Sequence, residues 1–475
     1  MNPIAIVPAR VAPPSTHSHK GLLDRFLGIF TEVHGGEGIT ALLLMFNVFL
    51  LLAAYYLLKT IREPLILTVP HGAEVKSYSA AATAGLLMLI VPAYSAIASR
   101  VSRVKLINGV TLFFMACLVA FFVLSRLNVP VGIPFFIWVG IFSLVVIAQL
   151  WAYANDLYTV EQGKRLFAII GFGASLGAIA GSFVTGQLVK IYGPYPFMLG
   201  AALLLAVCMV LTNIINLRER NHRGNATTAA TTTSTAPTAG AGQAQDGAAT
   251  VGGKNGFALV FADHYLLLIA ALMLVYNMVN TNGEYILGHT VVAMYTAAHP
   301  ALGAGGLDEK KVIGEFYGNF FTIVNVVSAL IQAFAVSRVI KWFGVRVALL
   351  VLPVVAIAGY ATMAFIPMLA LIRSVKMAEN AIDYSLQSTT RNALYLPTSR
   401  EAKYKAKQAN DTFFVRLGDV LSAGVVFAGT TWLGFAPRQF ALVNVGLILV
   451  WLVLAVAIGR KYHTLEAAAR QPAKR

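Results

Sequence analysis

Charged residues and cysteines are both scarce in this 475-residue chain. Only 12% of its residues are charged, whereas soluble proteins have about 25%. Hydrophobic residues make up 58% of the chain. The only two cysteines, Cys117 and Cys208, both lie in apolar segments, which excludes a disulfide framework and a thiolate metal site. The composition therefore excludes an ordinary soluble domain and indicates an all-α, polytopic membrane protein.

Motifs for nucleotide hydrolysis, dinucleotide binding and metal binding are also absent. The chain has no G-x-x-x-x-G-K-[ST] loop, and its nine histidines form no H-x-x-x-H pair. The run "GFGASLGAIAG" at 171–181 has the wrong glycine spacing for a dinucleotide fold and follows no predicted strand. Its Gly173, Gly177 and Gly181 recur every four residues, which is typical of a close-packed face between membrane helices. No metal, no cofactor and no enzymatic activity are expected.

Long apolar segments dominate what is present. A bilayer-spanning helix needs roughly 20 mostly apolar residues, and twelve segments qualify. Their predicted spans are 39–60, 77–98, 104–125, 133–154, 165–190, 195–217, 262–287, 312–336, 345–366, 367–396, 408–436 and 438–459. The Ala/Thr/Gly-rich stretch 221–256 cannot bury a core and predicts a flexible linker.

These segments predict five regions along the chain. They are a cytoplasmic N-terminal segment (1–38) with an interfacial amphipathic helix at 20–33, a six-helix lobe (39–217), a linker (218–261), a second six-helix lobe (262–459) and a tail (460–475). The lobes resemble each other: "SRVSRVKLINGVTLF" follows the second helix and "SRVIKWFGVRVALL" follows the eighth. Parallel six-helix repeats are typical of the major-facilitator architecture, which binds substrate between the halves.

The positive charge follows the expected topology. The chain has 36 Lys and Arg against 20 Asp and Glu, which alone would suit a nucleic-acid partner. Most of these cations fall in segments on one side of the expected membrane, and the positive-inside rule assigns that side to the cytoplasm. We therefore expect both termini in the cytoplasm, a bacterial inner-membrane location, and no nucleic-acid partner.

The stretch "YYLLKTIREPLIL" at 55–67 places two cations near the predicted end of the first helix. Pro64 would kink or end a helix, but apolar residues resume at once, so we expect the helix to continue to about Val69. Tyr55, Lys59 and Arg62 then share one face, and two cations beside a tyrosine suit an anion. The alternative is that both cations extend to the lipid headgroups.

Other ionisable residues also fall within the predicted helices, where they are costly and hence candidates for function. They are Glu284, Glu315, Arg373, Lys376, Glu379, Asp383, Asp411, Arg416 and Asp419. Arg373, Lys376, Asn380 and Asp383 share one face of the tenth helix, which predicts either a cavity wall or a self-neutralising stripe. Interhelical ion pairs that lock the halves together are the alternative.

Four stretches carry a resemblance to a known family. They are "YYLLKTIREPLIL", "LWAYANDLYTVEQGKRLFAIIGFGASLG", "VYNMVNTNGEYIL" and "NALYLPTSREAKYKAKQAND". In them the chain resembles the ATP/ADP antiporter family of plastids and obligate intracellular bacteria. The resemblance implies that Arg62 takes the position of a lysine important for transport and that Glu284 takes that of the seventh-helix glutamate. Val139 stands where the family has a fourth-helix glutamate, and Asp383 where it has a tenth-helix lysine.

Residue pattern and resemblance together predict a two-part site. The expected substrate-binding residues are Lys59, Arg62, Tyr55, Asn155, Arg373, Lys376, Lys403, Lys405 and Lys407. The expected gating or coupling residues are Glu284, Glu379, Asp383, Asp411 and Arg416. We expect Glu284 to pair with Arg62 or Lys59 across the halves, and the three clustered lysines to point in different directions.

Three functions fit the sequence. The resemblance implies ATP/ADP exchange by alternating access, with a nucleotide anion and the bilayer as partners and a monomer as the expected state. A proton-coupled carrier of another small solute, with Glu284 or Asp383 taking up the proton, would use the same fold. A membrane interaction scaffold without transport is the third.

Overall fold

The computed structural model describes residues 37–98, 100–158, 160–231, 256–299, 305–399 and 401–470. Within these ranges the chain forms helices and turns and no strand. The expected interfacial helix at 20–33 and the centre of the expected linker, 232–255, lie outside the described residues.

Six long helices precede the linker and form the N-terminal half. They are α2 (Glu37–Leu67), α3 (Gly72–Ala98), α4 (Arg103–Arg126), α5 (Gly132–Leu157), α6 (Val160–Tyr192) and α7 (Pro196–Thr231). The structure confirms that the first helix continues past Lys59 and Arg62, because α2 ends only at Leu67 with Pro64 inside its last turn. Both cations therefore lie within a helix and not in a loop.

The second helix begins earlier than the sequence predicts. Its apolar pattern starts at residue 77, but α3 begins at Gly72 and includes Lys76. Lys76 is buried, with 6% of its surface exposed. The predicted start of the helix at residue 77 is therefore too late, because Lys76 lies inside α3, where the carboxylates of Glu63 and Glu284 compensate its charge.

The C-terminal half is less regular. It contains α8 (Gly256–Ala262), α9 (His264–Ala298), α10 (Leu307–Leu330), η1 (Ile331–Ala335), α11 (Val336–Phe365), α12 (Leu369–Ile382), η2 (Asp383–Gln387), α13 (Ser388–Ala393), η3 (Ala402–Ala406), α14 (Lys407–Ala409), η4 (Asn410–Phe414), α15 (Val415–Phe427), η5 (Ala428–Trp432) and α16 (Pro437–Arg470). The η segments are π-helical turns, which are frequent at functional sites.

Helix occupies both ends of the expected linker. The helix α7 runs to Thr231, past its predicted end at 217, and α8 begins at Gly256, before the predicted start of the second lobe. We define the linker side of the molecule as the end where α7 ends and α8 begins. The far side is the opposite end, where α2 turns into α3.

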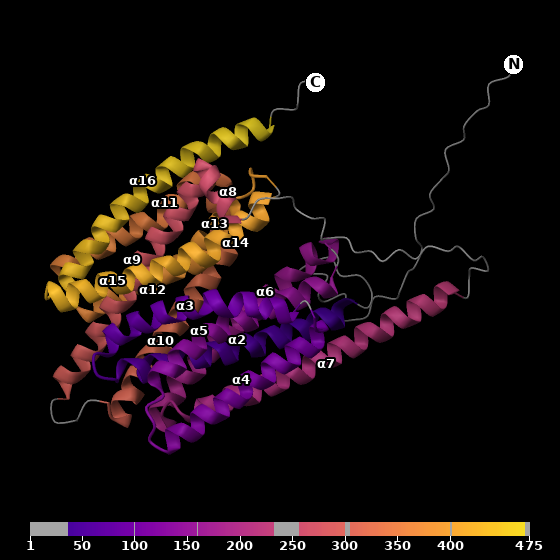
Figure 1. Ribbon diagram of the computed structural model, residues 1–475, viewed down its shortest axis with the longest axis horizontal. Coiled ribbons are helices and arrows are strands. Elements are labelled where there is room, and N and C mark those ends of the chain that lie inside the picture. The colour runs from indigo at the N-terminus through magenta and orange to yellow at the C-terminus, as the bar shows by residue number, and fades with distance from the viewer. Residues whose placement is uncertain are drawn as a thin grey trace.

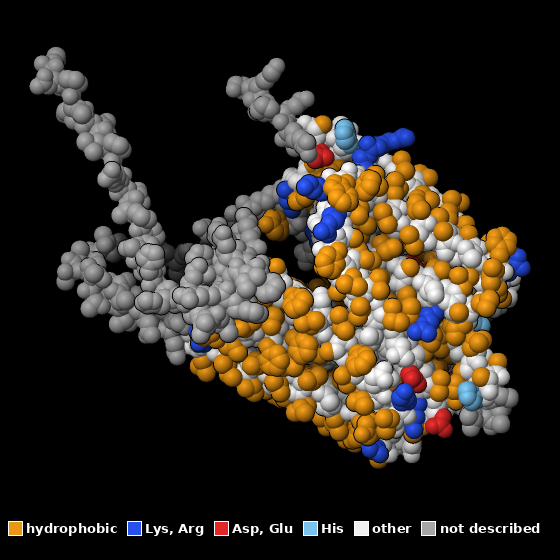
Figure 2. Space-filling model, turned by 180° about the vertical axis from the view of Figure 1, so that it is seen from behind, with side chains coloured by type: hydrophobic (Ala, Val, Ile, Leu, Met, Phe, Trp, Pro, Cys, Tyr) orange, Lys and Arg blue, Asp and Glu red, His pale blue; other side chains and the backbone are white. Residues whose placement is uncertain are grey.

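Ten helical segments of the described chain are long and apolar enough to cross a membrane. One of them, Leu307–Phe365, has 59 residues and a break at Gly344, whose φ of 75° is not helical. Apolar side chains cover most of the face shown in Figure 2, and lipid tails can solvate such a surface. The chain is a multi-pass integral membrane protein.

The helices lie side by side (Figure 1) and enclose two buried clusters, one within the N-terminal half and one centred on the C-terminal half, which also takes Tyr56 and Phe136 from the N-terminal half. Leu58, Phe142 and Leu205 belong to the core of the N-terminal half. Tyr276, Leu352 and Trp451 belong to that of the C-terminal half. Between the halves, α10 packs on α6 and α2, while α3 packs on α9 and α15. The interface between the halves therefore contains four helix pairs, and a site there would receive residues from both.

Small residues allow the closest helix contacts. A Cβ added to Gly173, Gly177 or Gly181 of α6 would lie 2.2–2.5 Å from a backbone carbonyl oxygen of α2. This confirms the close-packed glycine face. Gly186 of α6 meets Gly318 of α10 in the same way across the two halves. The site-bearing helix α2 is thus held against α6 by backbone contact.

Candidate functional site

A polar cavity of about 270 Å³ lies between the two halves. Ten or more of its lining side chains can donate or accept hydrogen bonds. Its walls are formed by Tyr55, Lys59, Arg62 and Glu63 of α2, Lys76, Ser77, Ala80 and Thr83 of α3, Phe136, Gly140 and Ser143 of α5, Asn280, Thr281, Glu284 and Tyr285 of α9, Phe321 of α10, Asn380 of α12, Tyr384 of η2, and Arg416 and Asp419 of α15. Both halves contribute cations and carboxylates to this wall, so a bound anion would contact both.

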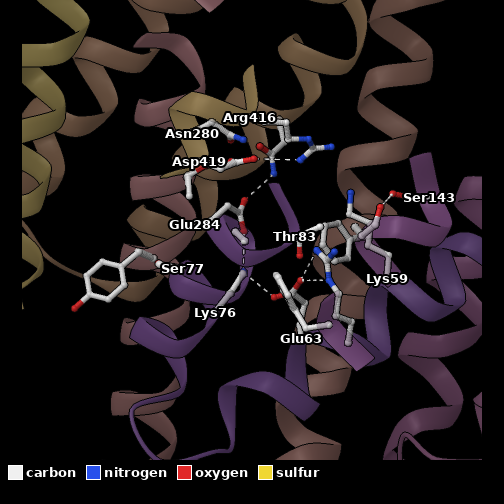
Figure 3. A pocket seen from close by; sticks show the side chains of 18 of the residues that line it. Lys59, Glu63, Lys76, Ser77, Thr83, Ser143, Asn280, Glu284, Arg416 and Asp419 are labelled. Carbon is white, nitrogen blue, oxygen red and sulfur yellow. Dashed lines mark hydrogen bonds and ion pairs between the residues drawn. The ribbon is translucent and has the colours of Figure 1, made fainter. Parts of the chain in front are cut away.

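Six charged residues form an alternating series, here called the charge chain, that crosses from one half to the other. The nitrogen–oxygen distances are 2.9 Å for Arg62–Glu63, 2.7 Å for Glu63–Lys76, 3.3 Å for Lys76–Glu284, 3.7 Å for Glu284–Lys376 and 2.9 Å for Lys376–Glu379. Figure 3 shows Lys76 between the carboxylates of Glu63 and Glu284. The Lys76–Glu284 pair is the link that joins α3 of the N-terminal half to α9 of the C-terminal half.

The charge chain is deeply buried at three of its members. The exposed fraction of the side chain is 1% for Glu63, 0% for Lys376 and 2% for Glu379. A buried charge without a partner costs several kcal/mol, and alternation gives each charge a neighbour of opposite sign. Tyr360 also donates a hydrogen bond of 3.0 Å to Glu379. Lys376 and Glu379, the members of the charge chain farthest from α2, are therefore fixed by contacts within the C-terminal half.

Lys59 has a different environment from the other cations of the cavity. Its Nζ donates to the Tyr384 hydroxyl at 2.9 Å and lies 4.6 Å from the ring centroid of Phe321 and 5.1 Å from that of Tyr56. Among the described residues, no carboxylate lies within ion-pair distance of it. Aromatic faces attract a cation without neutralising it, so Lys59 can still bind an anion.

Arg416 and Asp419 form a second charged group in the C-terminal half. The Asp419 carboxylate accepts hydrogen bonds from Asn277 at 2.7 Å, Thr281 at 2.9 Å and Arg416 at 3.1 Å. These three donors fix the position of the carboxylate. With these two residues the cavity wall has four cations and three carboxylates, which leaves it positive overall.

The structure brings five of the predicted site residues to this cavity and places two directly behind it. Tyr55, Lys59, Arg62, Glu284 and Arg416 line the wall. Lys376 and Glu379 are buried behind Glu284. Of the predicted polar stripe, only Asn380 lines the cavity, while Lys376 is neutralised by Glu284 and Glu379.

The remaining predicted residues lie outside the cavity. Asn155 is exposed near the end of α5 on the linker side. Arg373 stacks on Phe316, with 5.3 Å between its guanidinium and the ring centroid. Asp383 pairs with Arg391 at 3.3 Å. Asn155 is exposed, and Arg373 and Asp383 have partners outside the cavity, so none of the three lines it.

The predicted cluster of Lys403, Lys405 and Lys407 also lies away from the cavity. Lys403 is exposed on η3, Lys405 is half-buried, and Lys407 pairs with Asp411 at 2.5 Å. The three lysines therefore differ in exposure and in partners, and none of them lines the cavity.

The predicted partners of Glu284 are wrong. The sequence suggested Arg62 or Lys59, but Glu284 pairs with Lys76 and Lys376 and accepts a hydrogen bond from Asn380. Arg62 instead pairs with its neighbour Glu63. Because Glu63 pairs with Arg62 within α2, Glu284 pairs with Lys76 of α3 instead.

Several cavity residues were absent from the predicted site, among them Glu63 of α2, Tyr384 of η2, and Lys76, Ser77 and Thr83 of α3. Lys76, Ala80 and Thr83 recur at helical spacing, so they share one polar, small-residue face of α3. Such a face beside a lysine was the available signal. The sequence analysis did not use this face, because the apolar pattern placed the start of the helix after Lys76.

Comparisons with known proteins agree on a family and a fold. The family model described as TLC ATP/ADP transporter matches residues 133–378. The ADP,ATP carrier protein 1 of Chlamydia pneumoniae is 23% identical over 359 residues, which cover 69% of this chain and 67% of that protein. The corresponding protein of Chlamydia trachomatis is 22% identical over 369 residues, 69% of this chain and 65% of that one. The chain thus spans about two thirds of the length of the curated relatives it matches.

Solved structures show the same fold at low sequence identity. A mutant form of the nucleoside transporter NupG matches with a TM-score of 0.58 and 13% identity, over 90% of this chain and 99% of that chain. The POT family transporter PepTSo matches with a TM-score of 0.59 and 11% identity, over 90% and 98%. Both are transporters, and the likeness concerns the arrangement of helices.

Proposed function

Because the chain belongs to the TLC ATP/ADP transporter family, we propose that this secondary transporter exchanges ATP and ADP across a membrane by alternating access. The relatives that it matches are named ADP,ATP carriers. A family of transporters performs no bond chemistry on its substrate, so the protein is not an enzyme.

The cavity between the halves is the observation that supports this proposal most directly. It is polar, it carries more cations than carboxylates, and Lys59 lies in its wall without a carboxylate partner among the described residues. A polyphosphate needs several convergent cations. Arg62 and Lys76 would supply them once the phosphates replace Glu63 and Glu284 as their partners.

Competition between the substrate phosphates and the carboxylates of the cavity would account for exchange. Without substrate, the Lys76–Glu284 pair holds the halves together on the far side. A bound phosphate would compete for Lys76, weaken that link and let the halves move apart there. An empty cavity would reform the pair, so the return step would depend on a second nucleotide. This is the expected behaviour of an antiporter.

The proposal includes a topology of twelve membrane spans. A straight helix of 59 residues would be about 90 Å long, roughly three times the hydrocarbon thickness. Leu307–Phe365 would therefore cross twice, with its turn near Gly344. The charged helix of residues 369–393 would cross once, protected from lipid by its neighbours. Both termini would then lie in the cytoplasm of a bacterial inner membrane.

Uptake by proteoliposomes tests the function. Labelled ADP should enter vesicles that contain unlabelled ATP or ADP, and should not enter empty vesicles or vesicles loaded with inorganic phosphate alone. Lys59→Gln should lower uptake at limiting ADP by about tenfold, since a charge-assisted contact contributes 1.5 kcal/mol or more. Lys403→Gln, an exposed cation outside the cavity, is the matched control.

The same assay separates the proton-coupled alternative. Uptake into nucleotide-free vesicles that requires a pH gradient and stops with a protonophore would contradict exchange and favour a proton-coupled carrier. Absence of uptake for every nucleotide tested, from protein that still unfolds cooperatively, would contradict nucleotide transport.

A further inference from the structure

A second cavity continues the first one toward the linker side. It measures about 320 Å³ and is bounded by α3 and α5 of the N-terminal half and by α8, η4 and α15 of the C-terminal half. Its lining consists of Ala84, Leu87, Met88, Val91, Pro92, Leu144, Phe257, Thr412, Phe413 and Arg416. Only Thr412 and Arg416 among these are polar. We call this space the apolar vestibule.

The helices α3 and α5 each line both cavities. On α3 the polar cavity takes Ala80 and Thr83, and the vestibule takes the following residues from Ala84 to Pro92. On α5, Ser143 belongs to the polar cavity and Leu144 to the vestibule. The change from polar to apolar occurs in the same direction on both helices, so the two cavities are successive parts of one cleft.

Arg416 lies at the junction, because it lines both cavities. Its side chain is 30% exposed and its guanidinium pairs with Asp419 on the polar side. On the same segment of chain, Thr412 and Phe413 lie one turn toward the linker side. A guanidinium at this boundary can contact a phosphate with its edge and a flat ring with its face.

Two aromatic rings form the wall opposite α3. Phe413 of η4 and Phe257 of α8 meet edge to face, with ring centroids 5.0 Å apart and an interplanar angle of 87°. Met88 and Val91 line the vestibule from the other half. Thioether and aromatic side chains that line the same space are suited to a flat, weakly polar ring.

We propose that the apolar vestibule binds the nucleobase of the substrate while the phosphates occupy the polar cavity, with Arg416 between them. This inference rests on the proposed nucleotide transport and adds how the site recognises the base. Since Thr412 and Arg416 are the only polar side chains among the described residues that line the vestibule, the base is held by stacking and apolar contact. Every nucleobase has a π-face, so recognition should tolerate different bases.

Competition binding tests the vestibule. Purified protein in nanodiscs binds labelled ADP, and unlabelled ADP, GDP or inorganic pyrophosphate competes. In the wild type, GDP should compete within about threefold of ADP, and pyrophosphate should be at least roughly tenfold weaker than ADP because it has no ring to stack. In Phe413→Ala, ADP affinity should fall by roughly tenfold while pyrophosphate affinity stays within twofold.

Phe261→Ala is the control variant. Phe261 lies on α8 like Phe257, is 65% exposed and lines neither cavity. It should leave both affinities unchanged. Phe413→Leu, which keeps an apolar side chain of similar volume, separates the loss of the ring from a packing defect and should also weaken ADP selectively.

Each other result contradicts the inference in a distinguishable way. Equal weakening of ADP and pyrophosphate by Phe413→Ala would show that Phe413 acts on the conformation, so the vestibule would not be a base subsite. Rejection of GDP by more than about a hundredfold would contradict recognition by stacking. Wild-type protein that binds pyrophosphate but no nucleotide would overturn the proposed function together with the vestibule.

Discussion

At the scale of single residues, the environment of a charge decides its role. Lys59, Lys76 and Lys376 are all lysines of membrane helices, but only Lys59 lacks a carboxylate partner among the described residues. Lys76 joins the two halves, and Lys376 neutralises a carboxylate that is 2% exposed. Substitutions at the three positions should therefore have different consequences for binding, exchange and stability.

Glu284→Gln should slow exchange more than it weakens binding. The substitution removes the carboxylate that holds Lys76 across the halves, and it leaves the cavity more positive. We expect exchange to fall by about tenfold, while ADP affinity stays the same or rises. Equilibrium binding and counterflow on the same preparation provide the comparison.

Glu315→Gln is the control, because Glu315 also forms a pair between the halves but is 38% exposed, and exposed pairs contribute little. Exchange at the wild-type rate in Glu284→Gln would contradict the coupling role.

Lys376→Met should destabilise the protein. It leaves Glu379 buried without its cation, which costs about 3–5 kcal/mol when a buried pair is broken. The double variant Lys376→Met/Glu379→Gln should recover part of that loss, because an amide can still accept the hydrogen bond from Tyr360. Thermal unfolding in detergent measures both variants. A double variant no more stable than the single one would mean that the lysine acts by packing and not by charge.

At the scale of helices, close contact between α2 and α6 fixes the position of the cavity cations. Gly177 of α6 lies against the Phe49 carbonyl of α2, and an added Cβ would lie 2.2 Å from that oxygen. A helix carrying Lys59 and Arg62 is thus held by backbone contact along its length. The helix α3 likewise carries Lys76 of the polar cavity and several residues that line the apolar vestibule.

Gly177→Ala should therefore separate α2 from α6 and destabilise the N-terminal half. Overpacking of this kind costs about 1–3 kcal/mol, and the displaced cations should also weaken ADP binding. Gly171→Ala on the same helix is the matched control, because a Cβ there meets no atom within 4 Å. Thermal unfolding and ADP binding measure the two effects. Equal stability of the two variants would contradict the role of the glycine face.

At the scale of the whole molecule, the two halves are joined on the far side. The pairs Lys76–Glu284 at 3.3 Å and Lys190–Glu315 at 3.3 Å, and the hydrogen bond from Tyr285 to Glu74 at 3.3 Å, all connect the N-terminal to the C-terminal half there. The apolar vestibule lies on the linker side of the polar cavity. The apolar part of the cleft therefore lies toward the linker side, opposite the contacts that join the halves.

A covalent link on the far side should trap this conformation. In the variant Lys190→Cys/Glu315→Cys, without the native cysteines, a short bifunctional reagent should abolish exchange but leave ADP binding from the linker side intact. Proteoliposome exchange before and after the reaction measures the effect. The control link, Asn108→Cys/Asn213→Cys, joins two helices of the same half whose side chains are hydrogen-bonded at 2.9 Å. Exchange that survives the first link, or stops with the second, would contradict movement of the halves as two units.

The sequence by itself determined the all-helical membrane class, the continuation of the first helix past Lys59 and Arg62, and the family. These properties depend on local hydrophobicity, spacing and short motifs, which a single helix already contains. The pairing of charges was decided only by the tertiary structure. Lys76 is a buried link because Glu63 and Glu284 reach it from two other helices, and Asp383 pairs with Arg391 at 3.3 Å, outside the cavity. A buried charge takes whichever opposite charge the fold brings within about 4 Å, and helical spacing along one segment contains no information about that partner.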